Sequence, residues 1–145
     1  MNTTLKNFVV YVVIAGKDKS DHVHLRNAIY RYLPQAIVES LYEPLETRNF
    51  FKKNSPSPHL IFLGLDMIKS GGKDLLNLFR DSETLTQVPM VILTESMQRF
   101  TRNDLIRFGA NDFYSKPYQP DAFDKIVANI STKLGLLVAP KVNRA

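Results

Sequence analysis

Few residues of this chain have the type and spacing for chemistry, and they follow apolar runs that predict strands. Asp66 comes two residues after Gly64, which stops the run Leu60–Leu63, and Asp18 and Lys116 each follow another such run. Because ligands of parallel sheets bind just past the carboxyl ends of the strands, we expect the function to be located there. A carboxylate at such a place can act as a nucleophile or hold a hard cation, and a lysine can bind an anion.

The sequence excludes several other chemistries. It contains no cysteine, so disulfides, thiolate chemistry and cysteine-based metal sites are excluded. No P-loop, Gly-x-Gly-x-x-Gly pattern or Ser/His/Asp arrangement is present. His22 and His24 are two residues apart on a predicted helix and point to different sides, and His59 comes just before a strand. The histidines therefore do not predict a metal cluster.

The predicted strands are short, apolar and rich in β-branched or aromatic residues. The run Leu60–Leu63, bounded by Pro58 and Gly64, is typical of a strand that is buried on both faces. Such a strand belongs in the middle of a parallel sheet. The predicted strands, in chain order, are Phe8–Ile14, Ala36–Tyr42, Leu60–Leu63, Met90–Thr94 and Ala110–Ser115.

Helical spacing of apolar residues predicts a helix after each strand. The predicted helices start at a cap formed by Ser20 or Asp21, at Pro44, after the Gly71-Gly72 loop, at about Met97 and at Pro120. Strict alternation with short connections implies a parallel sheet with right-handed crossovers. We therefore predict an α/β fold, a single three-layer α/β/α domain over residues 1–138, with a frayed tail over residues 139–145.

Three segments then carry a resemblance to a known family. They are the Gly71-Gly72 loop, the segment Val88–Thr94, and Gly109–Pro117, which reads Gly-Ala-Asn-Asp-Phe-Tyr-Ser-Lys-Pro and is the most specific of the three. With the order of the elements, they resemble the receiver domain of response regulators, the bacterial two-component proteins that include the chemotaxis regulators. The resemblance extends over roughly residues 6 to 135 and implies a flavodoxin-like, five-stranded parallel sheet with the strand order 2-1-3-4-5.

The resemblance assigns roles to four residues of this chain. In the family, the lysine that matches Lys116 contacts the phosphoryl group, and its peptide bond to the proline that matches Pro117 is usually cis. The hydroxyl of Thr94 matches the family's switch hydroxyl at the end of the fourth strand. Phe113 matches the aromatic switch position three residues before the lysine.

The chain departs from the family at the positions that carry out phosphorylation. Phosphoryl transfer needs a nucleophilic carboxylate after the third strand and a hard cation held by oxygen ligands. The family's pair of metal-binding acids aligns with Gly16 and Lys17, and its acceptor aspartate aligns with Gly64. Lys17 places a positive charge where a cation ligand would stand, and this charge opposes the binding of Mg²⁺. We therefore expect no metal and no cofactor.

Two alternatives remain open at the same strand ends. Asp66 or Asp18 could serve as an unusual phosphoacceptor with Mg²⁺, although the spacing from Gly64 to Gly72 favours Gly64 as the acceptor position. Lys17 and Lys116 could instead bind an anion or a nucleotide. Without an acceptor carboxylate, we expect Lys116 to pair with Asp18 or Asp66 and to hold the loop.

Composition limits the class of protein. With 145 residues, 44% hydrophobic and 23% charged, the chain has the size and composition of one globular domain. No apolar run approaches the length of a membrane span, and the amino terminus does not resemble a signal peptide, so we expect a cytoplasmic protein. The net charge of +5 is compatible with nucleic acid, with an acidic protein partner or with a scattered positive surface. No lysine-rich stripe favours nucleic acid.

The expected function is therefore that of a stand-alone, atypical receiver that is not an enzyme and acts by binding proteins. By resemblance, its partner would be a histidine kinase, a phosphotransfer protein, an effector or a second copy of the chain. The expected contact face comprises the fourth helix, fifth strand and fifth helix. It includes Arg99, Arg102, Arg107, Tyr114 and Tyr118.

Overall fold

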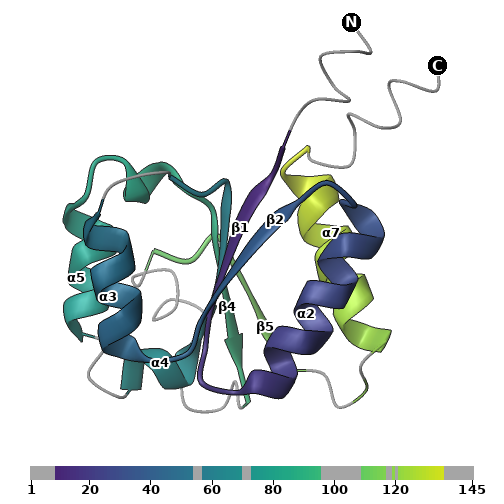
Figure 1. Cartoon of the computed structure of the whole chain (residues 1–145), viewed down its shortest axis with the longest axis horizontal. Coiled ribbons are helices and arrows are strands. Elements are labelled where there is room, and N and C mark those ends of the chain that lie inside the picture. Colours follow the sequence, from purple (N-terminus) through teal and green to yellow (C-terminus); the bar gives the residue numbers. More distant parts are fainter. Residues whose placement is uncertain are drawn as a thin grey trace, which may run out of the picture.

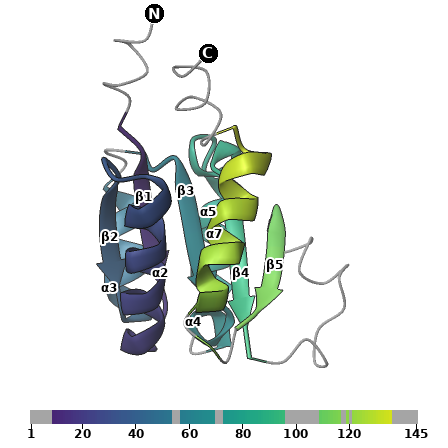
Figure 2. The same cartoon turned by 90° about the vertical axis from the view of Figure 1, so that its right-hand side faces the viewer.

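The computed structural model describes residues 9–53, 57–69, 73–95, 109–116, 119 and 121–135. Within these ranges, five parallel strands form one sheet in the order β2-β1-β3-β4-β5. The predicted fold class and strand order are confirmed, and β3 lies at the centre of the sheet (Figure 2). The strands are β1 (Tyr11–Ala15), β2 (Ile37–Leu41), β3 (Leu60–Gly64), β4 (Met90–Thr94) and β5 (Asp112–Ser115).

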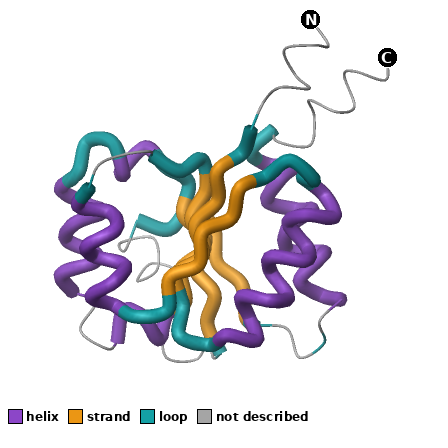
Figure 3. Tube along the Cα trace, viewed as in Figure 1, coloured by secondary structure: helices purple, strands orange, loops and turns teal. Residues whose placement is uncertain are grey.

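Helices cover both faces of this sheet and make three layers. Figure 1 shows α2 and α7 on one side of the strands and α3 and α5 on the other, and Figure 3 shows the strands as the middle layer. The helices are α2 (Lys19–Tyr32), α3 (Pro44–Lys52), α4 (Leu65–Lys69), α5 (Lys73–Asp81) and α7 (Asp121–Lys133), with a 3-10 turn η1 (Leu85–Gln87) before β4.

Alternation along the strands divides the core into two halves. Successive side chains of a strand point to opposite faces. Val12 and Ile14 therefore pack in the cluster under α2 and α7, whereas Val13 and Ala15 pack in the cluster under α3 and α5. Every residue of β3 is buried, as expected for a central strand covered on both faces.

The start of α2 differs from the prediction. The side chain of Asp18, rather than that of Ser20 or Asp21, caps this helix, because Asp18 Oδ1 accepts bonds from the backbone N–H groups of Ser20 (2.8 Å) and Asp21 (3.4 Å). The prediction of Ser20 or Asp21 was wrong because three polar residues with capping ability stand within four positions. Only the dihedral angles of the turn decide which of them precedes the first helical residue.

A second difference concerns the chain after β3. A short helix, α4, begins at Leu65, directly after Gly64, where no helix was predicted. The predicted helix near Met97–Phe108, the Gly71-Gly72 loop and the tail lie outside the described residues. The division into a domain over 1–138 and a tail remains a prediction. No helix among the described residues is long and apolar enough to cross a membrane.

Candidate functional site

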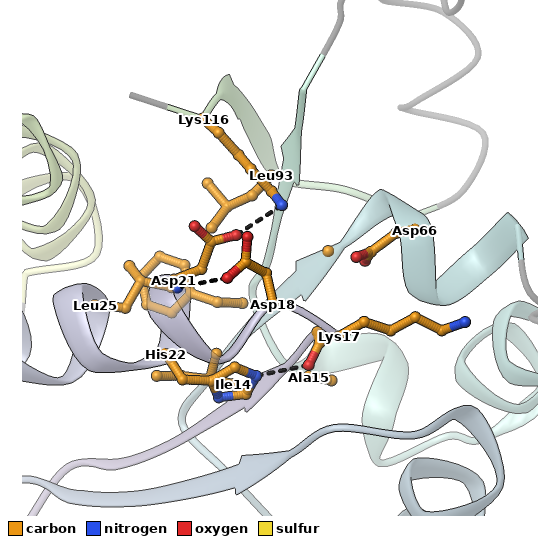
Figure 4. A pocket seen from close by; sticks show the side chains of 13 residues that line it. Ile14, Ala15, Lys17, Asp18, Asp21, His22, Leu25, Asp66, Leu93 and Lys116 are labelled. Atoms are coloured by element: carbon orange, nitrogen blue, oxygen red, sulfur yellow. Dashed lines mark hydrogen bonds and ion pairs between the residues drawn. The ribbon is translucent and has the colours of Figure 1, made fainter. Parts of the chain in front are cut away.

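A small pocket lies at the carboxyl ends of β1, β3 and β4, where the sequence placed the function. Its floor is apolar and its rim is charged, with Asp18, Asp21, Asp66 and Lys116 on the rim (Figure 4). The remaining cavity measures about 10 Å³, which is about the space of a single water molecule. The lining residues are Ile14, Ala15, Gly16, Lys17, Asp18, Asp21, His22, Leu25, Phe62, Gly64, Asp66, Leu93 and Lys116.

Lys116 is the basic group of this pocket, and its position is set by the sheet. Its backbone N–H donates to the carbonyl of Thr94 (2.8 Å), which continues the pairing of β4 with β5. Its Nζ lies 2.7 Å from Asp21 Oδ2 and 3.6 Å from Glu95 Oε1. The prediction that Lys116 pairs with Asp18 or Asp66 missed Asp21, which the first turn of α2 presents to the ammonium group, although the charge of Asp66 also acts on Lys116.

Charge complementarity keeps Lys116 protonated. Burial alone would lower the pKa of Lys116, but the hydrogen bond with Asp21 and the negative charges of Asp21, Asp66 and Glu95 outweigh burial and raise the pKa above its ordinary value. The ammonium group is well shielded, since the Lys116 side chain is 13% exposed and that of Asp21 is 19% exposed. Sequence reasoning assigned no role to Asp21 beyond capping. The only available signal was its place three residues after Asp18, on the same end of one helix.

The two residues aligned with the family's metal-binding acids carry no carboxylate. Gly16 follows β1, and a Cβ placed there would come no closer than 3.7 Å to its neighbours, so space does not exclude a side chain. Lys17 is exposed, and Figure 4 shows its side chain directed away from Lys116. The structure therefore does not bring Lys17 and Lys116 together as one anion site.

Asp66 reaches the place that Gly64 leaves open. A Cβ built on Gly64 would lie 2.6 Å from Asp66 Oδ1, closer than such atoms approach in real structures. The backbone of Gly64 is not in the left-handed region, which in the described chain holds only Gly109 and Gly135 among the glycines. Glycine at position 64 therefore provides space rather than an unusual backbone conformation.

A divalent cation does not fit the donor set of this pocket. Asp18 uses Oδ1 for the cap of α2, and Asp21 is paired with Lys116. No group of three His, Asp or Glu side chains in the described part of the chain is placed to hold a metal ion. Both carboxylates are instead engaged within the protein, Asp18 with backbone N–H groups of α2 and Asp21 with Lys116.

The two positions matched to the family's switch lie at the ends of β4 and β5. Thr94 is buried, with 4% of its surface exposed, and its carbonyl accepts the N–H of Lys116. Phe113 is half-buried on β5, opposite Ile92 of β4. Pro117 lies outside the described residues. The roles of these residues in switching therefore remain predictions.

His22 is a buried residue of the pocket to which sequence reasoning gave no role. Its Nε2–H donates to the carbonyl of Gly16 (2.7 Å), and its ring lies 4.4 Å from that of Tyr42. Burial lowers the pKa of His22, although the bond to Gly16 opposes this effect. The other two histidines lie elsewhere, since His24 stacks on Phe123 and His59 Nδ1 accepts the N–H of Tyr11.

The predicted partner face is described only in part. Arg99, Arg102, Arg107 and Tyr118 lie outside the described residues. Tyr114 lies on β5, where its hydroxyl donates to Asp112 Oδ2 (3.1 Å) and accepts a bond from Asn129 of α7. Asp112 also receives Lys133 Nζ at 2.6 Å, so this side of the face is held by a network that joins β5 to α7.

Comparison with known proteins agrees with this geometry. Residues 18–128 match the response regulator receiver domain. Among solved structures, the phosphorylated cyanobacterial phytochrome response regulator RcpA is similar with a TM-score of 0.75 and 19% identity, over 86% of this chain and 92% of that chain. A search of curated proteins found no match.

Two further structures show the same fold. The Mn²⁺-bound response regulator Rcp1 has a TM-score of 0.69 and 22% identity, over 85% of this chain and 92% of that chain. The chemotaxis response regulator CheY4 of Vibrio cholerae has a TM-score of 0.68 and 15% identity, over 85% of this chain and 99% of that chain. At these identities the likeness concerns the fold.

Proposed function

We propose that this chain, which belongs to the response regulator receiver family, acts in two-component or phosphorelay signalling as a protein-interaction module whose binding does not depend on phosphorylation. Receiver domains are typically non-catalytic signalling modules that interact with other signalling proteins. The observation that carries the proposal is the set of residues at the ends of β1 and β3. Gly16, Lys17 and Gly64 provide neither a carboxylate nucleophile nor a carboxylate ligand for a divalent cation.

The charge network supports the same proposal. Lys116 is already neutralised by Asp21 and Glu95, so no phosphoryl group is needed to hold it in place. Partner binding would then depend on a surface that is formed in the absence of phosphate. We propose that this surface comprises the predicted helix near Met97–Phe108, β5 and α7. The partner would be a kinase, a phosphotransfer protein, an effector or a second copy of the chain.

Amide NMR tests the phosphorylation part of the proposal directly. Spectra are recorded with and without Mg²⁺ plus beryllofluoride, an analogue of the phosphoryl group on aspartate. A receiver domain that retains the two metal-binding acids and the acceptor aspartate is treated in parallel and shows that the reagent is active. We expect no shift of Asp18, Asp66, Thr94 or Lys116 in this chain. A saturable, Mg²⁺-dependent shift centred on Asp66 would contradict the proposal.

One observation favours a second candidate function, phosphorylation on Asp66. Its Oδ1 lies 2.6 Å from the position of a Cβ on Gly64, so a carboxylate is present near the acceptor position. Incubation with a small acyl-phosphate donor and Mg²⁺ should then give acid-labile phosphate that is lost in Asp66→Asn and retained in Asp18→Asn. Absence of label in the native chain excludes this candidate.

The switch residues provide a test of coupling. If a Thr94/Phe113 equilibrium survives, a partner that prefers one state should shift it. Thr94→Ala and Phe113→Ala should then change the affinity for a captured partner. Thr84→Ala, an exposed residue just before η1 and away from β5 and α7, should leave it unchanged. Equal affinities of the native chain and the two switch variants would exclude the switch, while leaving open binding at a fixed surface.

A further inference from the structure

In the pocket, the carboxylate of Asp66 lies unusually close to the place that a Cβ on Gly64 would occupy. In an aspartate side chain, the Cβ and either carboxylate oxygen lie about 2.4 Å apart, from ordinary C–C and C–O bond lengths. The distance from the Cβ position of residue 64 to Asp66 Oδ1 is 2.6 Å. An oxygen of Asp66 is thus as far from that position as an oxygen of an aspartate at position 64 would be.

The local fold explains how a residue two positions later reaches this place. In a continued strand, Asp66 would lie about 6.6 Å beyond Gly64, at a rise of about 3.3 Å per residue. Instead α4 begins at Leu65, so the chain turns at the end of β3. The carboxylate then lies back over the strand end, and Figure 4 shows it at the edge of the pocket.

We propose that Asp66 is an internal replacement for the carboxylate missing at position 64, and that residue 64 is glycine because the Asp66 side chain occupies its space. This inference deepens the proposed function and rests on it for its meaning in signalling. Lys116 is paired with Asp21, and the negative charge of Asp66 also acts on Lys116, from the other side in Figure 4. About 10 Å³ of space remains in the pocket that Asp66 helps to line.

Among the neighbours of Gly64, only Asp66 would clash with a side chain at position 64. Apart from Asp66 Oδ1, the nearest atoms to a Cβ on Gly64 are Gly16 Cα at 3.4 Å and the carbonyl oxygen of Ala15 at 3.7 Å. These are ordinary contacts. A methyl group at position 64 should therefore disturb Asp66 and little else, and an alanine at this strand position would otherwise be favourable.

A thermal-unfolding cycle at pH 7 tests the inference. Gly64→Ala should lower the Tm of the native chain by roughly 2–6 °C, because Asp66 must leave its place. In an Asp66→Ala background, Gly64→Ala should leave the Tm unchanged or raise it by up to about 3 °C. In an Asp66→Asn background, which keeps the shape without the charge, the loss should persist. Equal effects of Gly64→Ala in the native and Asp66→Ala backgrounds would overturn the inference.

Two controls complete the experiment. Gly16→Ala, whose Cβ meets nothing closer than 3.7 Å, should have the same effect in the native and Asp66→Ala backgrounds, and a dependence on Asp66 would show that the coupling is not specific to Gly64 and so overturn the inference. Acid-labile phosphate on the native chain is measured separately. Such label would overturn the proposed function, whereas the thermal cycle would still report whether Asp66 occupies the space beside Gly64.

Discussion

At the scale of single residues, the pocket depends on one ion pair that the sequence did not reveal. Lys116 and Asp21 are both largely shielded from solvent, so each depends on the other for charge compensation. We expect Lys116→Met to lower the free energy of unfolding by about 1–3 kcal/mol, since it leaves Asp21 without its nearest cation. Asp21→Asn should recover part of this loss.

Urea unfolding of the four members of this double-mutant cycle measures the coupling. Glu95 provides a matched control, because it faces the same ammonium group at 3.6 Å but is 81% exposed. Glu95→Gln should therefore change the stability by less than about 0.5 kcal/mol. Additive effects of Lys116→Met and Asp21→Asn would show that the pair contributes no coupling energy.

His22 gives the domain a dependence on pH near neutrality. Burial lowers the pKa of His22, with Arg26 adding to this effect and with Gly16, Asp21 and Asp18 opposing it. A second proton on Nδ1 would find no acceptor among the described residues. Since the unfolded histidine titrates at about 6.5, the unfolded state takes up a proton that the folded state excludes. The stabilising contribution of neutral His22 is thus complete above this pH and declines below it.

We therefore expect the urea concentration at the midpoint of unfolding to be lower at pH 5.5 than at pH 7.5. In His22→Gln the difference between the two pH values should be smaller. His24→Gln is the matched control, because His24 lies on the same helix but stacks on Phe123 at the surface of the core. It should retain the pH dependence of the native chain. If the urea midpoint of His22→Gln changed with pH as much as that of the native chain, another group would be responsible for the pH dependence.

At the scale of elements, the cap of α2 is the clearest test. Asp18→Ala should destabilise the domain by about 0.5–2 kcal/mol, because two backbone N–H groups lose their acceptor. Ser20→Ala, an exposed residue in the first turn of the same helix, should cost less than about 0.5 kcal/mol. Chemical denaturation distinguishes the two, and a larger loss for Ser20→Ala would reassign the cap.

The same elements show what a sequence can and cannot predict. β3 and β4 were predicted almost to the residue because buried central strands are continuous apolar runs with glycine or proline at their ends. The apolar face of α7 was predicted in the same way, from Phe123, Ile126 and Ile130. The short helix α4 was not predicted, because five residues are too few to show a helical period.

The location of the pocket was predicted, but the pairing of its charged side chains was not. The strand ends identified Asp18, Asp66 and Lys116, yet they did not reveal which carboxylate meets the lysine. That choice depends on the rotation of α2 about its axis and on the turn into α4, neither of which has a periodic signature. A different rotation of α2 would present another side chain than Asp21 to Lys116, and a different turn into α4 would move Asp66 away from Gly64.

At the scale of the whole molecule, one sheet is shared by two cores. Ile29 of α2 lies in the cluster on one face, and Ile61 of β3 lies in the cluster on the other. Because adjacent residues of the same strands build both clusters, neither half can open while the other keeps its support. We expect Ile29→Val and Ile61→Val each to lower the stability by about 0.5–1.5 kcal/mol and to shift the same transition.

Far-UV circular dichroism and tyrosine fluorescence, followed during urea unfolding, measure whether that transition is single. The double variant should show the sum of the two losses within about 0.5 kcal/mol, since the two side chains pack on opposite faces of the sheet. Thr132→Ala, on the exposed side of α7, serves as the control with little effect. Two separate transitions, each sensitive to only one of the isoleucines, would show that the layers on the two faces fold independently.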